Sequence, residues 1–390
     1  MIYLFILFTI IVVSIFLIDV VPELYVWQSR IKIGRFASAE IWKNKVVTRS
    51  KKWLQNVPTI PISDNKRLIV IDILRNNYKR TAVQSWQEAA LILGLNEYIK
   101  RTSHSQTQRE VDSFFATKIT SSGSWKVKPT EIDHAMIAYA FLNIESINHQ
   151  KYKSAFDETY QMILSLKGED GTIAYKNHVR EFRFVDTVGF VSPFLVLYGI
   201  KFNVTEAIDL AVKQITEYQK YGMMPTENIP CHTYNVHTKI PTGLFGWGRG
   251  LGWFVIGLID TWKLLPSEHP DKKILQTIIV ETAKSATKYQ NENGSFPWLL
   301  FDHGSRSDSS VTATLSWFYN LASEIPEITN LCTTAKHKCN SYLQSATRRN
   351  GAVDFSQGDT KGIGVYSHNF DILPFTQGFV LRNLFYNSGN

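Results

Sequence analysis

The sequence Phe245-Gly-Trp-Gly-Arg-Gly-Leu-Gly-Trp253 leads directly into Phe254-Val-Ile-Gly-Leu-Ile-Asp-Thr-Trp262, which is apolar on nearly every side. A helix that is apolar all round is buried in a core. The glycines before it let the backbone approach a ligand closely, while tryptophan offers a flat apolar face and arginine a planar fork for a carboxylate. The sequence therefore predicts a ligand-facing loop that leads into a buried helix.

The contrast between buried and surface helices repeats along the chain. Segments such as 132–144, 191–200 and 311–321 are apolar on most faces. Others, such as 150–167 and 204–220, carry charges on one side. We interpret the two types as inner and outer helices of one fold. Apolar periodicity predicts helices over 39–56, 65–77, 82–99, 104–119, 130–147, 150–167, 182–199, 204–220, 246–265, 270–291, 306–324, 328–348 and 372–387.

Polar turns that contain a glycine recur after the outer helices. The three clearest, 169–175, 292–298 and 349–355, continue into alternating apolar residues, the signal of a short strand or hairpin. A repeat of roughly 50 to 65 residues corresponds to one helical hairpin and its loop. We therefore predict an all-α fold, an (α/α)6 toroid of about six helical hairpins with short β-hairpins in its loops. An open solenoid is the alternative.

The N-terminal segment 1–18 contains no charged side chain and is long enough for a marginal membrane span. A cleaved signal peptide is the alternative, but no Lys or Arg precedes the apolar run and no small-x-small site directly follows it. We favour an uncleaved single-pass anchor, with the cytoplasmic side favoured by the basic residues that follow. The expected parts are 1–21 as a transmembrane or signal anchor, 22–60 as a membrane-proximal helical segment and 61–390 as the toroid.

Composition narrows the partners of the chain. Its 390 residues carry a formal net charge of +8, which favours an acidic ligand or an anionic membrane surface. The Lys and Arg residues are scattered rather than gathered in a dense run, so a nucleic-acid partner is not expected. Cys231, Cys332 and Cys339 form neither a disulfide framework nor a metal-spaced cluster. We interpret them as free thiols, with a Cys332–Cys339 pair as the alternative, and expect no metal or cofactor.

Acidic residues stand where the chain enters two of the inner helices. Asp133 lies in the first turn of an otherwise apolar helix, and an interaction with the dipole of that helix is the simpler explanation. Asp186 lies between apolar neighbours, and Ser192-Pro193 marks a helix start that would leave it in the approach loop. If both carboxylates meet at one mouth of the toroid, they suit a proton donor and its partner in glycosidic chemistry.

Other polar and aromatic residues precede the inner helices or lie in the loops between them. His232 is expected to make a polar contact to a sugar, and His237 to lie on the surface of the long loop 221–244. Their spacing, without nearby acidic ligands, argues against zinc. The remaining candidates are Trp247 with Arg249, Trp298 with Asp302 and His303, Asp308 with Ser309 and Ser310, and His368 with Asn369.

Three motifs in the order 185–195, 246–254 and 307–310 carry a family resemblance. Val185-Asp-Thr-Val-Gly-Phe-Val-Ser-Pro-Phe-Leu195, Gly246-Trp-Gly-Arg-Gly-Leu-Gly-Trp-Phe254 and Ser307-Asp-Ser-Ser310 resemble the unsaturated glucuronyl and rhamnogalacturonyl hydrolases of glycoside hydrolase families 88 and 105. The resemblance covers about residues 80 to 387 and implies a six-hairpin (α/α)6 barrel. In such enzymes an aspartic acid protonates the C4=C5 double bond of a terminal unsaturated uronic acid, water adds at C5, and the hemiketal opens to release the next sugar.

The resemblance also implies roles for individual residues. Asp186 matches the acid/base and Asp133 the second acid of the site. His232 and Arg249 match substrate-binding positions, and Trp247 and Trp253 are candidates for stacking on a sugar. Trp298, Asp308 and Ser309 complete the expected substrate-binding set. Leu251 stands where the family usually has Asn, so we expect altered specificity to arise there first.

The leading hypothesis is a membrane-anchored glycoside hydrolase that acts on an acidic, unsaturated oligosaccharide. One alternative is a non-catalytic or altered relative that binds glycans during surface-polysaccharide assembly. Another is a sugar epimerase or lyase on a similar toroid, for which His232 would have to converge with His368 or His303 in the cavity.

Overall fold

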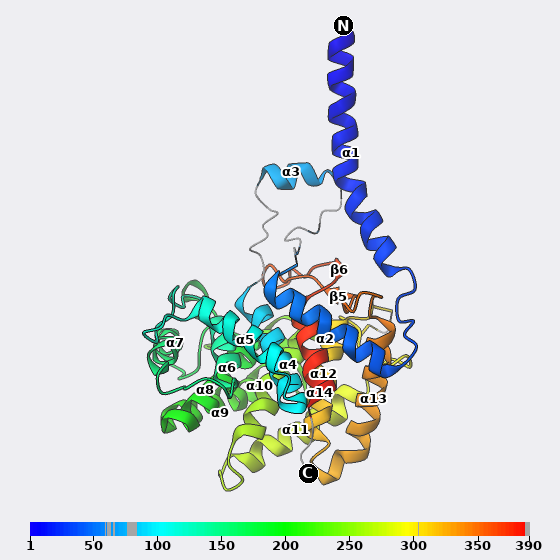
Figure 1. Cartoon of the computed structure of the whole chain (residues 1–390). Coiled ribbons are helices and arrows are strands. Elements are labelled where there is room, and N and C mark those ends of the chain that lie inside the picture. The colour runs from blue at the N-terminus through cyan, green and yellow to red at the C-terminus, as the bar shows by residue number, and fades with distance from the viewer. Residues whose placement is uncertain (59, 61–63, 65–66, 76–83, 303, 387–390) are drawn as a thin grey trace.

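The computed structural model describes residues 1–58, 60, 64, 67–75, 84–302 and 304–386. Within these residues the chain forms a ring of inner helices surrounded by outer helices (Figure 1). The inner helices are α4 (Ser85–Thr102), α6 (His134–Leu142), α8 (Val185–Phe202), α10 (Gly248–Leu264), α12 (Ser309–Ala322) and α14 (Pro374–Phe385). Each packs against the next, and α14 packs against α4, so the ring is closed. The toroid is therefore confirmed, and the open solenoid is excluded.

The outer helices alternate with the inner ones along the chain. They are α2 (Ala39–Gln55), α5 (Ser105–Lys118), α7 (Lys153–Ser165), α9 (Thr205–Tyr221), α11 (Lys272–Thr287) and α13 (Thr329–Ser345). On α9 the buried residues include Ala207, Leu210, Ala211, Ile215 and Tyr218, a spacing that places them on one face of the helix. By contrast, every residue of α12 is buried. The two patterns explain why the sequence separates inner from outer helices.

Short strands join the helices. β1 (Phe182–Phe184), β2 (Met223–Met224), β3 (Ile229–Asn235) and β4 (Pro241–Phe245) form one antiparallel sheet in which β3 pairs with the other three strands. Much of the segment 221–244 is therefore strand, and its prediction as a long loop is wrong. β5 (Ser356–Gln357) pairs with β6 (Phe370–Asp371). Because β1 leads directly into α8, its pairing with β3 brings segment 231–235 close to the start of that helix.

Two of the three recurring glycine turns are closed by isolated antiparallel bridges. Lys167 pairs with Ile173, and Thr347 pairs with Val353. Gly171 and Gly351 have positive φ angles of 76° and 88°, which a residue with a side chain rarely adopts. Short hairpins are therefore present at two of the three predicted turns, whereas at 292–298 the bridge runs from Pro297 to Ser307.

The N-terminal helix α1 (Ile2–Arg30) is continuous through Pro22 and runs past the boundary expected at residue 21. It leaves the toroid as a long separate helix, with the short helix α3 (Ile69–Leu74) packed beside it (Figure 1). Two described helices are long and apolar enough to cross a membrane. One is α1, whose apolar window has no buried residue, and the other is α8, whose window is 78% buried as part of the core.

The segment 22–60 does not stand apart from the toroid. Its helix α2 packs against both α4 and α14 as an outer helix, and Trp42 donates from Nε1 to Thr347 Oγ1 at 3.0 Å. The three cysteines are free and buried, as predicted.

Candidate active site

A cavity of about 170 Å³ opens where the chain enters α4, α8 and α10. Six of its fifteen lining residues are aromatic, and its polar side chains include two carboxylates, one histidine, one arginine and two lysines. The lining residues are Gln84, Trp86, Tyr175, Lys176, Phe184, Asp186, Phe190, His232, Trp247, Arg249, Trp253, Asp359, Thr360, Lys361 and Gly362. Aromatic side chains together with several convergent polar groups are typical of a small-molecule site.

Asp186 lies in the first turn of α8 and lines this cavity. The expectation that it sits in an approach loop is wrong, because α8 begins at Val185 and continues through Pro193. The Oδ2 atom of Asp186 is buried without a hydrogen-bond partner among the described residues. The side chain is thus free to act on a ligand.

His232 lies between Asp186 and Tyr366. Its Nε2 atom is 3.6 Å from Asp186 Oδ2, and its Nδ1 atom is 2.9 Å from the Tyr366 hydroxyl. Leu244 N donates to that same hydroxyl at 3.3 Å, so the tyrosine proton is available for His232 Nδ1. Burial raises the pKa of Tyr366 to about 12, which keeps this proton on the tyrosine. With Tyr366 as the donor to Nδ1, the ring proton of His232 is on Nε2, which faces Asp186 Oδ2.

Asp133 is the N-cap residue of α6, but its side chain forms no cap hydrogen bond. It is not among the residues that line the cavity. Its Oδ1 atom is 3.6 Å from His134 Nδ1 and has no hydrogen-bond partner among the described residues. Burial raises the pKa of Tyr175, and the negative charges of Asp186 and Asp133 raise it further. The charges of the two predicted acids, which belong to two different inner helices, therefore both raise the pKa of Tyr175.

The motif of 246–254 forms one wall of the cavity. Trp247 donates from Nε1 to Gln357 Oε1 at 2.9 Å, and its ring centroid is 4.8 Å from that of His232. Trp253 is held by Phe190 and Phe375, with ring centroids 4.6 and 4.7 Å away. Both tryptophans line the cavity and are almost completely buried, so their rings are fixed before any ligand arrives.

Arg249 is only 2% exposed, and it holds another part of the wall in place. Its Nη1 donates to Gln357 O at 2.6 Å, and its Nη2 donates to Gly358 O at 2.7 Å and to Thr360 Oγ1 at 3.2 Å. The guanidinium therefore organises segment 357–360 while its charge stays at the cavity. Both Nη atoms of the guanidinium, which was expected to bind a substrate carboxylate, therefore already donate hydrogen bonds within the protein.

Three of the predicted substrate-binding residues do not line the cavity. Asp308 is completely buried and caps α12, with Oδ1 accepting from Ser310 N at 2.8 Å and from Gln357 N at 3.0 Å. Ser309 is completely buried in the first turn of the same helix. The Trp298 ring lies 6.2 Å from the Tyr366 ring, outside the lining. These positions support the wall from behind.

Leu251 is also absent from the lining. It is completely buried in the hydrophobic core, so the structure does not support the expectation that specificity changes first at this position.

Asp359 is a lining carboxylate that sequence reasoning missed. Its Oδ1 accepts from Thr360 N at 3.0 Å and its Oδ2 from Gln84 Nε2 at 3.1 Å. Burial raises the pKa of Asp359; Arg249 opposes this effect, whereas the charges of Asp186 and Asp133 add to it. The available signal was the run 358–362, in which two glycines flank Asp, Thr and Lys.

Comparison with known proteins agrees with this geometry. The profile of Glycosyl Hydrolase Family 88 matches residues 63–368 of the chain. This chain belongs to glycosyl hydrolase family 88. The resemblance seen in the three sequence motifs is therefore confirmed.

Solved structures share the toroid of this family 88 chain at low sequence identity. A possible member of family 105 from Klebsiella pneumoniae subsp. pneumoniae is 15% identical, with 90% of this chain and 93% of that chain covered and a TM-score of 0.75. An unsaturated glucuronyl hydrolase specific for heparin is 14% identical, with 88% and 95% covered and a TM-score of 0.68. An unsaturated glucuronyl hydrolase from Bacillus sp. GL1 is 14% identical, with 92% and 96% covered and a TM-score of 0.63.

The histidine pair expected for an epimerase does not form among the described residues of this family 88 chain. His232 lines the cavity, whereas His368 is exposed and is not part of the lining. His303 lies outside the described residues.

Proposed function

We propose that the chain is a membrane-anchored hydrolase that removes a terminal unsaturated uronic acid from an acidic oligosaccharide. The observation that carries this proposal is the position of Asp186. Its carboxyl group lies in the cavity, with Oδ2 3.6 Å from His232 Nε2. Family membership and the unsaturated glucuronyl hydrolases among the similar structures support this reaction class.

In the proposed reaction, protonated Asp186 donates its proton to C4 of the C4=C5 double bond, and positive charge develops at C5 and the ring oxygen. The resulting carboxylate accepts a proton from water as the water oxygen bonds to C5. The C5 hemiketal then opens by cleavage of the bond between C5 and the ring oxygen. This leaves a ketone at C5 and a hemiacetal at C1, which breaks down to an aldehyde and releases the next sugar.

The remaining residues of the cavity have roles that fit this substrate. His232, held by Tyr366, directs a ring proton toward Asp186 and so orients its carboxyl group. Trp247 and Trp253 offer fixed faces against which a sugar ring can pack. Lys176, Arg249 and Lys361 bring positive charge to the cavity, which favours the carboxylate of a uronic acid. Asp133 adds negative charge near the developing cation.

The test is the ultraviolet absorbance of the unsaturated uronide. The wild-type protein should remove this absorbance, and Asp186→Asn should slow the loss by about 10²–10⁴-fold, the usual contribution of a general acid. Asp209→Asn is the control, because Asp209 is exposed on α9, away from the cavity. If glycan binds but no unsaturated substrate loses absorbance, the non-catalytic glycan-binding alternative is correct.

A further inference from the structure

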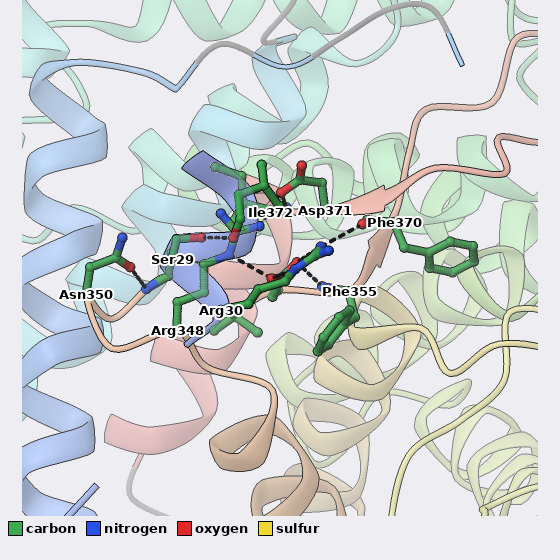
Figure 2. Close-up of polar contacts among 12 residues, drawn as sticks. Ser29, Arg30, Arg348, Asn350, Phe355, Phe370, Asp371 and Ile372 are labelled. Carbon is green, nitrogen blue, oxygen red and sulfur yellow. Dashed lines mark hydrogen bonds and ion pairs between the residues drawn. The ribbon is translucent and has the colours of Figure 1, made fainter. Parts of the chain in front are cut away.

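The C-terminal end of α1 is bound directly to the toroid. Arg30 donates from Nε to Asp354 Oδ2 at 2.7 Å and from Nη2 to Asp354 Oδ1 at 2.9 Å. Its Nη2 also donates to Phe370 O at 3.2 Å, and its guanidinium carbon lies 5.0 Å from the centroid of the Phe355 ring. Figure 2 shows Arg30 between Phe355, Phe370 and Arg348. A two-point bond of this kind fixes direction as well as distance.

The partner of Arg30 belongs to a buried ionic network. The Asp354 side chain is completely buried and is shared with Arg348, whose Nε lies 2.7 Å from Oδ2. Arg348 continues to Asp371 on β6 (Figure 2). Burial alone would raise the pKa of Asp354, but the hydrogen bonds from Arg30 and Arg348 outweigh it and lower the pKa. Asp354 therefore keeps its negative charge, and Arg30 at the end of α1 supplies one of the two positive charges that compensate it.

The same segment continues into the wall of the cavity. Gln357 lies three residues after Asp354, on β5. Its side chain accepts from Trp247, its carbonyl accepts from Arg249, and Asp359 and Thr360 follow it in the lining. The end of α1 is therefore joined to the rim of the cavity through one short stretch of chain.

Further contacts lie near α1 and near the same rim. Asp19 accepts hydrogen bonds from Leu68 N at 2.7 Å and from Ile69 N at 2.9 Å, which ties α3 to α1. Before α3, Asp64 forms an ion pair with Lys361 at 3.5 Å. Lys361 is an exposed lining residue, so it marks the open side of the cavity. Lys361 lies in the chain between β5 and β6, and Figure 1 shows both strands at the end of the toroid from which α1 leaves.

We infer that the cavity is held facing the membrane and that its substrate is an acidic glycan attached to that same membrane. The inference rests on the anchor in the proposed function. With 29 residues, α1 is about 44 Å long, whereas the hydrocarbon core of a bilayer is about 30 Å thick. The last turns of α1 therefore stand outside the bilayer and hold the rim next to it. Anchoring enzyme and substrate on one surface raises their effective concentration.

Orientation can be measured without any assay of activity. A donor fluorophore is attached to the full-length chain at Val365→Cys, beside the rim, or at Ser267→Cys, after the opposite end of α10. Both positions are exposed, and the native cysteines are buried. In vesicles with acceptor-labelled lipid headgroups, the label at 365 should transfer more energy than the label at 267. Equal or reversed transfer overturns the orientation, and absence of the protein from the vesicles overturns the anchor itself.

Arg30→Ala should reduce the difference between the two labels, because it removes the two-point bond to Asp354. Arg35→Ala is the matched control, since Arg35 is exposed in the segment that follows α1. If Arg30→Ala leaves the difference unchanged, Arg30 does not set the orientation.

The substrate class is tested with one unsaturated uronyl oligosaccharide presented in two ways, free in solution or linked to a lipid in the same vesicles. The wild-type protein should turn over the linked form faster by about tenfold or more at equal total concentration. Equal rates for the two forms contradict the inference that the substrate is attached to the membrane, but they do not contradict the hydrolase proposal. If the protein turns over neither the free nor the linked oligosaccharide, the hydrolase proposal is contradicted. The fluorescence result still decides the orientation.

Discussion

Asp359 shares the cavity with Asp186; burial raises the pKa of Asp359, and the charge of Asp186 raises it further. Because the folded state raises the pKa of Asp359, folding favours its protonated form. The contribution of Asp359 to folding stability is therefore fully present below the ordinary aspartate pKa of about 4. It is lost as pH rises through the raised pKa of the folded state. Above that window the ionised side chain opposes folding.

Asp359→Asn should therefore melt at a higher temperature than the wild type at neutral pH, because asparagine does not ionise. The gain should disappear below about pH 4, where Asp359 is protonated in both states. Thermal melts over a pH series check this expectation, with Asp209→Asn as the exposed control. A variant that is less stable at every pH would show that hydrogen bonds to Asp359 outweigh its charge.

Leu251 is completely buried in the core. Leu251→Ala should lower the free energy of unfolding by about 2–5 kcal/mol through the cavity it leaves. The KM of the folded enzyme for an unsaturated uronide should stay the same. Ile274→Ala, at a half-exposed position on α11, should change stability by less than about 0.5 kcal/mol. A changed KM with normal stability would restore a role for Leu251 in specificity.

The sequence predicted much of the cavity at the scale of single residues. Asp186, His232, Trp247, Arg249 and Trp253 all line it, because each stands in or near a motif that leads into an inner helix. Asp359 and Tyr366 come from a segment without periodicity, and only folding brings that segment to the same place. Asp308 shows the opposite case, since an acid before a helix can cap that helix instead of facing the cavity.

At the scale of elements, the ring closes where α14 packs against α4. The contact is very close, because a Cβ atom added to Gly378 would lie 2.2 Å from the backbone carbonyl carbon of Ala90. Likewise, a Cβ atom on Gly94 would lie 2.5 Å from Gly378 O. Backbone atoms cannot move aside as a flexible side chain can, so the two helices would have to separate.

Gly378→Ala should therefore destabilise the toroid by about 1–3 kcal/mol or more, although alanine is the better helix former. Chemical denaturation measures the change. Gly362→Ala is the control, because a Cβ atom there meets no atom within 4 Å and the exchange leaves the helices untouched. A stabilised Gly378→Ala would contradict the close contact between α4 and α14.

The helices themselves could be predicted because their two patterns of burial differ along the whole chain. The start of α8 was misplaced because Ser192-Pro193 has the form of a helix start, although Pro193 lies inside the helix. The sheet around β3 was missed because its short strands are paired by contacts distant in sequence, such as Phe184 with Thr233. Pairing of this kind leaves little local signal.

At the scale of the whole molecule, a buried ionic group joins the inner helices at the end opposite the cavity. Asp260, near the end of α10, accepts from Arg382 Nη1 at 2.7 Å, from Trp317 Nε1 at 2.8 Å and from the Tyr139 hydroxyl at 3.2 Å. These partners come from α14, α12 and α6. One carboxylate thus binds side chains from three other members of the ring.

Asp260→Asn should destabilise the protein by about 3–5 kcal/mol, because it leaves the buried charge of Arg382 without its counter-ion. Denaturation in detergent measures the loss, and Asp209→Asn again provides the exposed control. A change of less than about 1 kcal/mol, as for a surface ion pair, would contradict the role of Asp260 in holding the ring together.

The proposed reaction is tested most directly by following an unsaturated uronyl disaccharide by nuclear magnetic resonance in deuterium oxide. Proton donation by Asp186 to C4 predicts that the double bond is lost and deuterium appears at C4 as the second sugar is released. Asp186→Asn should slow all three changes by the same factor of about 10²–10⁴. Release of the second sugar by the wild-type protein with the double bond intact and no deuterium at C4 would contradict the proposal.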